Sequence, residues 1–396
     1  MTFDPEVPLP GAPEPWASST MPVLRDGPPF AMTEMIAAEP ELAERLLGRM
    51  ANDPVLPYVS EAIRVAAAAG QPIVLTGCGT SEHAAMVAAA LVDDALRSTG
   101  EFEAAPADLQ VRAVQAFELA RRPPSNGVVL AISHEGGTWA TNEALRLARA
   151  AGASTALITV SLRSPGAEIA QMTLATGEQD QSWCHTVGYL SPILAATAIA
   201  AELRSQSLDP AVVRGTLQAA AASHSAAESI AGALSRTTRL LLVGSGMDYA
   251  IARELALKIE EGARLPATAL QLETIRHGHL AAADDKTGLV MVLTDADGWG
   301  APLLERSLAV LRSAQALRMT ASLIVAADLD PSVEVELTPA GRLVVSGAAE
   351  LPRSAAAALA TAIPMQLLAE RLARARGANP DAIGREDPRQ AAAAEA

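Results

Sequence analysis

The feature that most constrains the fold is a strand, a glycine-rich turn and a helix that follow one another and then recur. The apolar run 73–76 leads into Gly77-Cys78-Gly79-Thr80-Ser81, and an Ala-rich segment then continues to Leu96 without a helix breaker. A second unit of this kind runs from 127–132 through the turn 133–138 into a helix expected over 139–150. Strands that alternate with helices predict a parallel sheet covered by helices on both faces.

The same pattern returns in the second half of the chain, where a strand at 239–243 leads into a turn at 244–249 and a helix over 251–262. Further strands are expected at 154–160, 171–175, 288–293, 322–326 and 343–345, and further helices at 187–203, 211–234 and 354–376. The helical spacing within 32–50 is interrupted at Pro40 and predicts two short helices.

The length of 396 residues suits two copies of one α/β sandwich, which we place at 30–205 and 210–376. The first 29 residues are rich in proline and lack periodicity, which predicts a flexible N-terminal tail outside the folded core. Residues 377–396 are expected to form a C-terminal tail.

Composition limits the partners of the chain. A net charge of −15 argues against a nucleic-acid partner, because binding to phosphate backbones relies on clustered Lys and Arg. The sequence has no uninterrupted apolar run long enough to span a membrane, and the N-terminus does not resemble a signal peptide. Two cysteines, Cys78 and Cys184, are too few for a disulfide framework, so a reducing cytoplasmic location is expected.

The two glycine turns of the first copy are candidate ligand sites. Backbone N–H groups at the start of a helix favour an anion, and the hydroxyls of Thr80, Ser81, Ser133 and Thr138 would add hydrogen bonds to a phosphate or a polyol. The alternative is that these side chains only cap the helices. Neither turn contains the lysine of a nucleotide-binding P-loop, which argues against a nucleotide site.

These turns resemble those of the sugar isomerase (SIS) domain family. The similarity continues in the second copy, where Ala256-Leu257-Lys258-Ile259-Glu260-Glu261 and Arg276-His277-Gly278-His279-Leu280 resemble the isomerase half of glucosamine-6-phosphate synthase. It covers roughly residues 35–376. The resemblance implies an α/β fold of two tandem SIS domains, each a parallel sheet flanked by helices in a three-layer sandwich.

The resemblance also implies an activity: an aldose–ketose isomerase that acts on a sugar phosphate through an enediol, as a homodimer without a cofactor or metal. In the family, Glu261 would move a proton between C1 and C2, and His277 would open the sugar ring from across the subunit interface. A carboxylate and an imidazole suit these roles near neutral pH. The alternatives are that Glu261 is one more solvated helix charge and that His277 is a core imidazole with satisfied hydrogen bonds. The implied substrate-binding residues are Gly79, Thr80, Ser81, Ser133, His134, Glu135, Gly136 and Thr138.

Three departures from the family pattern qualify this hypothesis. Glu135 places a carboxylate where a phosphate oxygen is expected, so either it points away, it caps the following helix, or the ligand carries no phosphate there. The C-terminal tail has no lysine for a Schiff base, and Arg385 cannot replace one because a guanidinium stays protonated, although it could close over a bound anion. Trp183 stands in a loop where relatives have small residues, and it is either a pocket wall that stacks on the sugar or a core residue.

Several activities therefore stay open at this point. The alternatives are an amino-sugar-phosphate deaminase or deglycase, an isomerase of an unphosphorylated sugar, and a non-catalytic regulator that binds sugar phosphates. Because no cysteine precedes Cys78, we expect no glutaminase activity.

Overall fold

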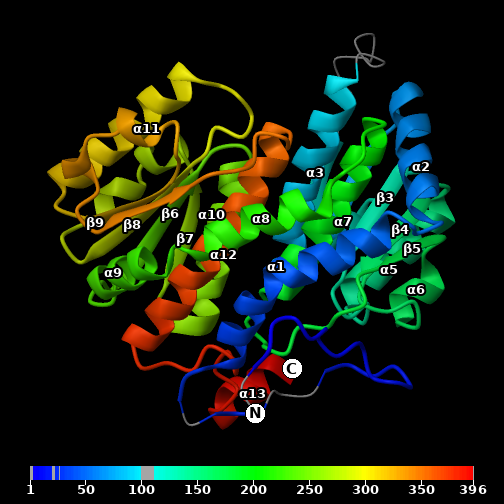
Figure 1. Cartoon of the computed structure of the whole chain (residues 1–396), viewed down its shortest axis with the longest axis horizontal. Helices are drawn as coiled ribbons and strands as arrows, with labels where there is room; N and C mark the ends of the chain where they lie inside the picture. Colours follow the sequence, from blue (N-terminus) through cyan, green and yellow to red (C-terminus); the bar gives the residue numbers. More distant parts are fainter. Residues whose placement is uncertain (1–2, 20–22, 26, 100–110, 396) are drawn as a thin grey trace. The chain divides into compact units, whose positions relative to one another are not determined.

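The computed structural model describes residues 3–19, 23–25, 27–99 and 111–395 and divides into two compact units (Figure 1). Unit 1 comprises Met1–Thr20, Ala38–Asp180 and Val187–Arg214, and unit 2 comprises Met21–Ala37, Gln181–Thr186 and Gly215–Ala396. The units interleave along the chain because one boundary falls inside the first helix, α1 (Ala31–Met50), and another inside α8 (Pro210–Ala221). The domain ranges predicted from the sequence are contiguous and remain predictions.

Unit 1 is built on a five-stranded parallel sheet in the order β2-β1-β3-β4-β5. Its strands are β1 (Ile73–Gly77), β2 (Val111–Gln115), β3 (Val128–Ile132), β4 (Ser154–Thr159) and β5 (Met172–Ala175). Its helices are α2 (Leu56–Ala68), α3 (Thr80–Ser98), α4 (Ala116–Arg121), α5 (Trp139–Ala151), α6 (Pro165–Ile169) and α7 (Val187–Leu203). One face of the sheet packs on α4 and α5 through buried Ala, Val and Leu side chains, and the other contacts α2, α3 and α7.

Unit 2 repeats this design with a parallel sheet in the order β10-β9-β8-β6-β7 (Figure 1). Its strands are β6 (Arg239–Gly244), β7 (Ala267–Gln271), β8 (Thr287–Leu293), β9 (Thr320–Ala326) and β10 (Gly341–Val345). Its α-helices are α9 (His224–Leu234), α10 (Met247–Lys258), α11 (Ala301–Ala316), α12 (Arg353–Ala375) and α13 (Pro388–Glu395). A π-helical turn, η1 (Ile259–Ala263), continues α10, and short 3-10 turns lie at η2 (Thr274–Arg276), η3 (His279–Ala282), η4 (Asp330–Ser332) and η5 (Val335–Leu337).

The sheet of unit 2 is also a central layer. Helix α11 covers one of its faces through a large apolar cluster, and α9, α10 and α12 contact the strands from the other face. The predicted α/β class, with two parallel sheets flanked by helices, is therefore confirmed.

The structure corrects two predictions of helices. Residues 31–50 form the single helix α1 with Pro40 inside it, because the loss of one N–H donor is offset by buried apolar side chains on both sides of the proline. The segment 211–234 forms two helices, α8 and α9, which are separated by a turn at Ala222 and Ser223. Strands β2 and β7 were not located from the sequence, because each is short and only partly buried.

Candidate active site

The first glycine turn lies at the carboxyl end of β1 in unit 1. Gly79 has a φ of +56° and ends the turn at the start of α3, and Thr80 is buried there while Ser81 is partly exposed. A Cβ atom on Gly77 would lie 2.6 Å from the backbone of Ser81, so the strand can approach the helix only with glycine at this position.

The second glycine turn follows β3, the strand that pairs in parallel with β1, so both turns meet at one edge of the sheet. The chain leaves β1 for β2 on one side and returns to β3 on the other, which makes this edge the topological switch point where ligands of open α/β sheets bind. Ser133 is buried, and its hydroxyl lies 3.4 Å from that of Thr138, the residue that precedes α5. The sequence-predicted residues Gly79 to Ser81 and Ser133 to Thr138 thus belong to one edge.

His134 is held by the backbone of unit 1. The amide of Asp180 donates to His134 Nε2 at 3.0 Å, and the Thr159 hydroxyl donates to the His134 carbonyl at 3.1 Å. A ring nitrogen that accepts a hydrogen bond carries no proton, so this imidazole is neutral. His134 therefore brings no positive charge to the turn.

The Glu135 carboxylate is held by two neutral donors. The Ser19 amide donates to Oε2 at 3.1 Å, and Gln179 Nε2 donates to Oε1 at 3.2 Å. The Glu135 carbonyl accepts a further hydrogen bond from Trp16 Nε1 at 3.1 Å. Residues that lie before the first helix thus contact the second glycine turn.

A second set of functional groups lies in unit 2, where α10 passes into the π-helical turn η1. Lys258 is fully buried, its Nζ lies 2.6 Å from Glu254 Oε1, and it also donates to the carbonyl of His185. Burial lowers the pKa of Lys258, but attraction to Glu254 and neighbouring acidic groups outweighs this and leaves the pKa above its ordinary value. Lys258 is therefore a fixed cation inside unit 2.

Glu261 lies on the π-helical turn, three residues after Lys258. Its Oε2 is shielded from solvent and has no hydrogen-bond partner in the described part of the chain. Burial raises the pKa of Glu261 to about 7, against the opposing attraction of Lys258 and a hydrogen bond from the Cys184 thiol. A carboxyl group with a pKa near 7 exchanges protons readily at physiological pH, as a general acid–base group must.

The loop that carries Cys184 brings Trp183 and the C-terminal tail into the same unit. The Trp183 amide donates to the Asp381 carbonyl at 3.1 Å, and the guanidinium of Arg385 lies 4.0 Å from the centroid of the Trp183 ring. Trp183 Nε1 and Arg385 Nε are both buried N–H donors without a partner among the described residues. Buried donors of this kind are normally satisfied, so an unpaired pair side by side suits an oxygen acceptor from a ligand.

Asp381 anchors this part of the tail. Its fully buried carboxylate accepts from the amides of Ala31 and Met32 at 2.7 and 2.8 Å and from the Ser182 hydroxyl at 3.0 Å. These bonds hold Asp381 of the tail beside Ser182, the residue that precedes Trp183.

His277 lies elsewhere in unit 2, directly after η2. Its side chain is 72% exposed, and its Nε2 lies 3.2 Å from Glu273 Oε1. The structure thus brings Trp183 and Glu261 together with Cys184, but it leaves His277 on an exposed segment. The alternative of a core imidazole is therefore wrong for His277.

Sequence reasoning overlooked Lys258 as a site residue. The signal was present, since Lys258 is one of two lysines in the chain and precedes Glu261 by three residues. What could not be read from the sequence is that its side chain is fully buried between Glu254 and His185.

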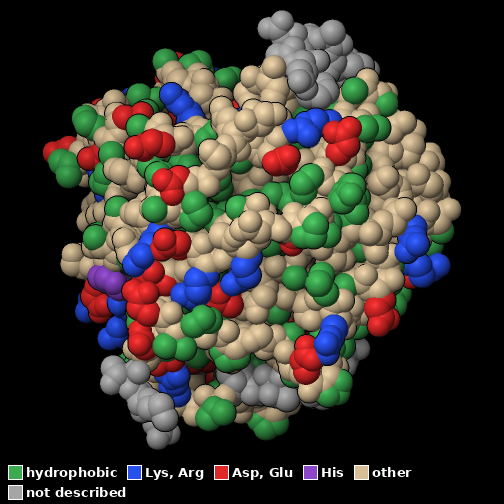
Figure 2. Space-filling view, turned by 45° about the vertical axis from the view of Figure 1, so that its right-hand side comes forward, with side chains coloured by type: hydrophobic (Ala, Val, Ile, Leu, Met, Phe, Trp, Pro, Cys, Tyr) green, Lys and Arg blue, Asp and Glu red, His purple; other side chains and the backbone are tan. Residues whose placement is uncertain are grey.

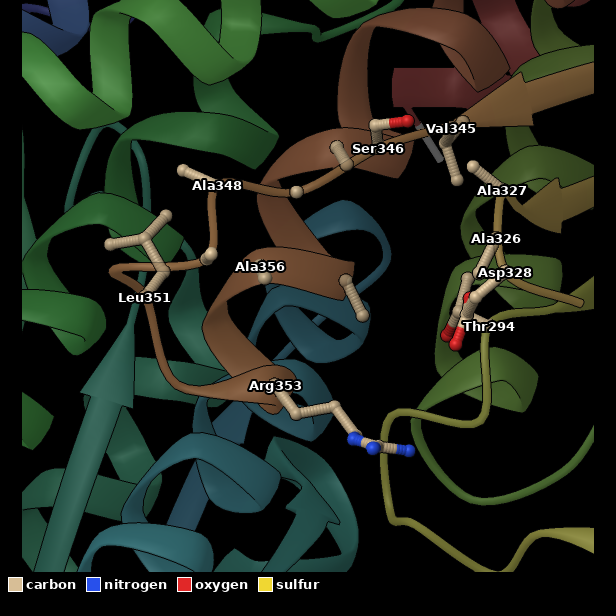
Figure 3. A pocket seen from close by; sticks show the side chains of 14 residues that line it. Thr294, Ala326, Ala327, Asp328, Val345, Ser346, Ala348, Leu351, Arg353 and Ala356 are labelled. Atoms are coloured by element: carbon tan, nitrogen blue, oxygen red, sulfur yellow. The ribbon is translucent and has the colours of Figure 1, made fainter.

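Unit 2 also contains a cavity of about 550 Å³ at the carboxyl ends of β9 and β10 (Figure 3). Small side chains line most of it, and Arg353 extends along its edge, where Nη1 lies 3.5 Å from Asp295 Oδ2. None of the site residues predicted from the sequence lines this cavity. It is therefore separate from the groups described above.

None of the helices in the described ranges combines the length and apolar character needed to cross a bilayer. On the face shown in Figure 2, acidic and basic side chains are interspersed. Within residues 3–19, 23–25, 27–99 and 111–395, no group of three or more His, Cys, Asp or Glu side chains is arranged to hold a metal ion.

Comparison with known proteins decides the family. The chain is 30% identical over 290 residues to the glutamine--fructose-6-phosphate aminotransferase [isomerizing] of Symbiobacterium thermophilum, which covers 68% of this chain and 45% of that protein. Its structure matches the C-terminal domain of glucosamine-fructose-6-phosphate aminotransferase from Francisella tularensis with a TM-score of 0.75 and 21% identity, over 91% of this chain and 99% of that one. The chain is a double SIS-domain protein.

Tagatose-6-phosphate ketose/aldose isomerase from Escherichia coli has the same SIS fold, with a TM-score of 0.71 and 17% identity over 91% of this chain and 98% of that one. The chain spans less than half the length of the first two curated relatives it matches. No protein-family model matches the sequence.

Proposed function

We propose that this SIS-domain protein is an aldose–ketose isomerase of a sugar phosphate, with Glu261 as the group that moves the proton between C1 and C2. The observation that carries the proposal is the shielded Glu261 carboxyl, whose pKa is about 7 and whose Oε2 has no hydrogen-bond partner among the residues that the structure describes. The relatives support the substrate class, because the names of the curated and structural relatives include phosphosugar isomerising enzymes.

The reaction needs one base that changes its protonation state twice. The Glu261 carboxylate takes the proton from C2 of the open-chain aldose, the electron pair of that bond forms the C1=C2 double bond, and the C1 carbonyl oxygen accepts a proton. Glu261 then returns its proton to C1 while the C2 hydroxyl loses its proton to solvent and becomes the ketone, which balances the proton that the C1 oxygen takes up from solvent. Atoms and charge balance without a cofactor.

Negative charge develops on the oxygens of the enediol during this exchange. Hydrogen-bond donors are needed to stabilise that charge. Trp183 Nε1 and Arg385 Nε are buried, adjacent and unpaired, so we assign them to the developing oxyanion. The fixed charge of Lys258 opposes the rise in the pKa of Glu261 and keeps it near neutrality.

An imine mechanism is less well supported. Lys258 is held as an ammonium by Glu254, and a protonated amine is not a nucleophile. The tail 377–396 contains no lysine at all. These two observations favour the enediol over a Schiff base and therefore isomerisation over amino transfer.

The test of this proposal is incorporation of solvent deuterium at C1 and C2 of fructose 6-phosphate and glucose 6-phosphate, followed by NMR. We expect exchange with the native protein and a loss of about 10²- to 10⁴-fold with Glu261→Gln. Glu260→Gln is the matched control, because this exposed neighbour only accepts a hydrogen bond from the Ala267 amide. If Glu261→Gln retains full exchange, or if the native protein exchanges neither sugar, the proposal is wrong.

The exposed position of His277 supports a role in the site of a second copy in a homodimer. Glu261→Gln and His277→Ala proteins would each lose activity, but a mixture that exchanges subunits would regain up to about a quarter of it, because one dimer site then holds both native residues. No recovery in mixed dimers would contradict a shared site.

A further inference from the structure

The segment that precedes the first helix crosses the second glycine turn of unit 1. We call residues 9–19 the N-terminal strap. Its first end is anchored near the end of β5, where the Leu9 amide donates to Glu178 Oε2 at 3.0 Å and the Gln179 amide donates to the Pro10 carbonyl at 2.8 Å. Leu9 is buried, so this end of the strap is packed against unit 1.

The middle of the strap lies directly against the turn. Trp16 Nε1 donates to the Glu135 carbonyl, and a Cβ atom on Gly137 would lie 3.0 Å from Cη2 of the indole. The ring therefore packs on the backbone of Gly137, and a larger side chain at this position would require the indole ring to shift. The strap forms a wall beside the residues expected to receive the ligand.

Ser19, the last residue of the strap, binds the carboxylate of Glu135. This is the carboxylate whose charge argues against a phosphate ligand at the second glycine turn. The Ser19 amide and Gln179 Nε2 occupy one oxygen each, and Gln179 Nε2 also donates to the Ser19 hydroxyl. In the described part of the chain, the carboxylate does not bond to Ser133 or Thr138, whose hydroxyls contact each other.

The charges around the second glycine turn make the position of the Glu135 carboxylate important. His134 is neutral and the two donors to Glu135 are uncharged, so none of these three groups supplies a positive charge to the carboxylate. A carboxylate that is free to rotate toward the hydroxyls would repel a phosphate in a partly dry site. Its two hydrogen bonds to Ser19 and Gln179 direct it toward the strap.

We propose that the N-terminal strap is a positioning element of the ligand site, which holds the Glu135 carboxylate on Ser19 and Gln179 so that the second glycine turn accepts a phosphate group. This inference rests on the proposed function for its choice of ligand. In this proposal, Glu135, Trp16 and Gln179 select between phosphorylated and unphosphorylated sugars.

The test is calorimetric titration of the full chain with fructose 6-phosphate, with inorganic phosphate and fructose as further probes. Gln179→Leu and Trp16→Ala are expected to weaken binding of fructose 6-phosphate by about tenfold, since a like charge near the phosphate costs at least this much. Binding of fructose would change less than about twofold, because it carries no charge. Glu135→Gln, added to either variant, would restore the affinity because the amide is neutral.

Glu14→Gln is the matched control. It removes an exposed ion pair between the same strap and Arg163 without touching Glu135, and it would leave all affinities unchanged. Any one of three results would overturn the inference. They are equal weakening of binding for fructose and fructose 6-phosphate, no rescue by Glu135→Gln, and no binding of either phosphate probe to the native protein. A protein that binds as expected but exchanges no deuterium would instead overturn only the proposed isomerase activity.

Discussion

Lys258 and Glu254 form an ion pair of 2.6 Å in which both side chains are fully buried. The pair lies one helical turn before Glu261, the shielded carboxyl group of the same unit. Because ions removed from water are costly unless they are paired, each partner makes the other tolerable. The pair therefore links the stability of unit 2 to the acid–base behaviour of Glu261.

Removal of one partner of this pair is expected to destabilise the protein. Lys258→Met leaves a buried carboxylate and Glu254→Gln leaves a buried ammonium, and each would lower the free energy of unfolding by about 3–5 kcal/mol. Urea denaturation followed by circular dichroism measures this. Arg97→Ala, which breaks an exposed pair with Asp93, is the control and would change stability by less than about 1 kcal/mol. Equal small effects in all three variants would contradict a structural role for the pair.

The pH dependence of exchange follows from the pKa of Glu261. Proton abstraction needs the carboxylate, so kcat/KM for deuterium exchange is expected to rise with pH and to level off above an inflection near 7. Lys258→Met, where it folds, would move the inflection upward, because the attraction that favours the carboxylate is lost. An inflection that stays in place in Lys258→Met would show that another group controls the profile.

The Glu261 carboxylate is also expected to lower the free energy of unfolding at alkaline pH. Its pKa in the folded protein is about 7, above the ordinary value of 4.5, so the folded state binds a proton more tightly than the unfolded state. Stability from this group is present below pH 4.5 and is lost as the pH rises through 7. Glu261→Gln should therefore raise the free energy of unfolding by about 1–3 kcal/mol at pH 8 and by little at pH 4. Thermal unfolding at the two pH values tests this, and equal effects at both would refute it.

Arg385 and Trp183 are expected to contribute to the rate rather than to the fold. Loss of one donor to a developing oxyanion typically costs about 10²-fold or more in kcat, so Arg385→Ala and Trp183→Phe should each slow deuterium exchange by about that factor. Arg389→Ala changes an exposed residue of the same tail, which pairs with Asp387, and it would leave the rate unchanged. Unaltered rates in Arg385→Ala would remove this residue from the site.

Local patterns were sufficient to predict most of the sheet. The runs at 73–76, 127–132, 239–243 and 288–293 are buried on both faces, so each reads as a continuous apolar segment, and all four are strands in the structure. The order of the glycine turns, Ser133 to Thr138 and Glu261 sufficed to identify the SIS family. Pro40 misled the prediction of helices, because a proline's local cost does not reveal how much burial surrounds it.

Local patterns in the sequence predicted the class of fold, the two copies and the SIS family, and they pointed to Glu261 as the carboxyl group proposed to move a proton. The acid–base and hydrogen-bonding properties of these groups depend on the folded structure, because burial and charge pairing involve residues far apart in the chain. The tertiary structure placed Lys258 against Glu254, stacked Arg385 of the tail on Trp183, and joined Ser19 to Glu135 across more than a hundred residues. Long-range contacts of this kind set pKa values and orient donors, and no local spacing encodes them.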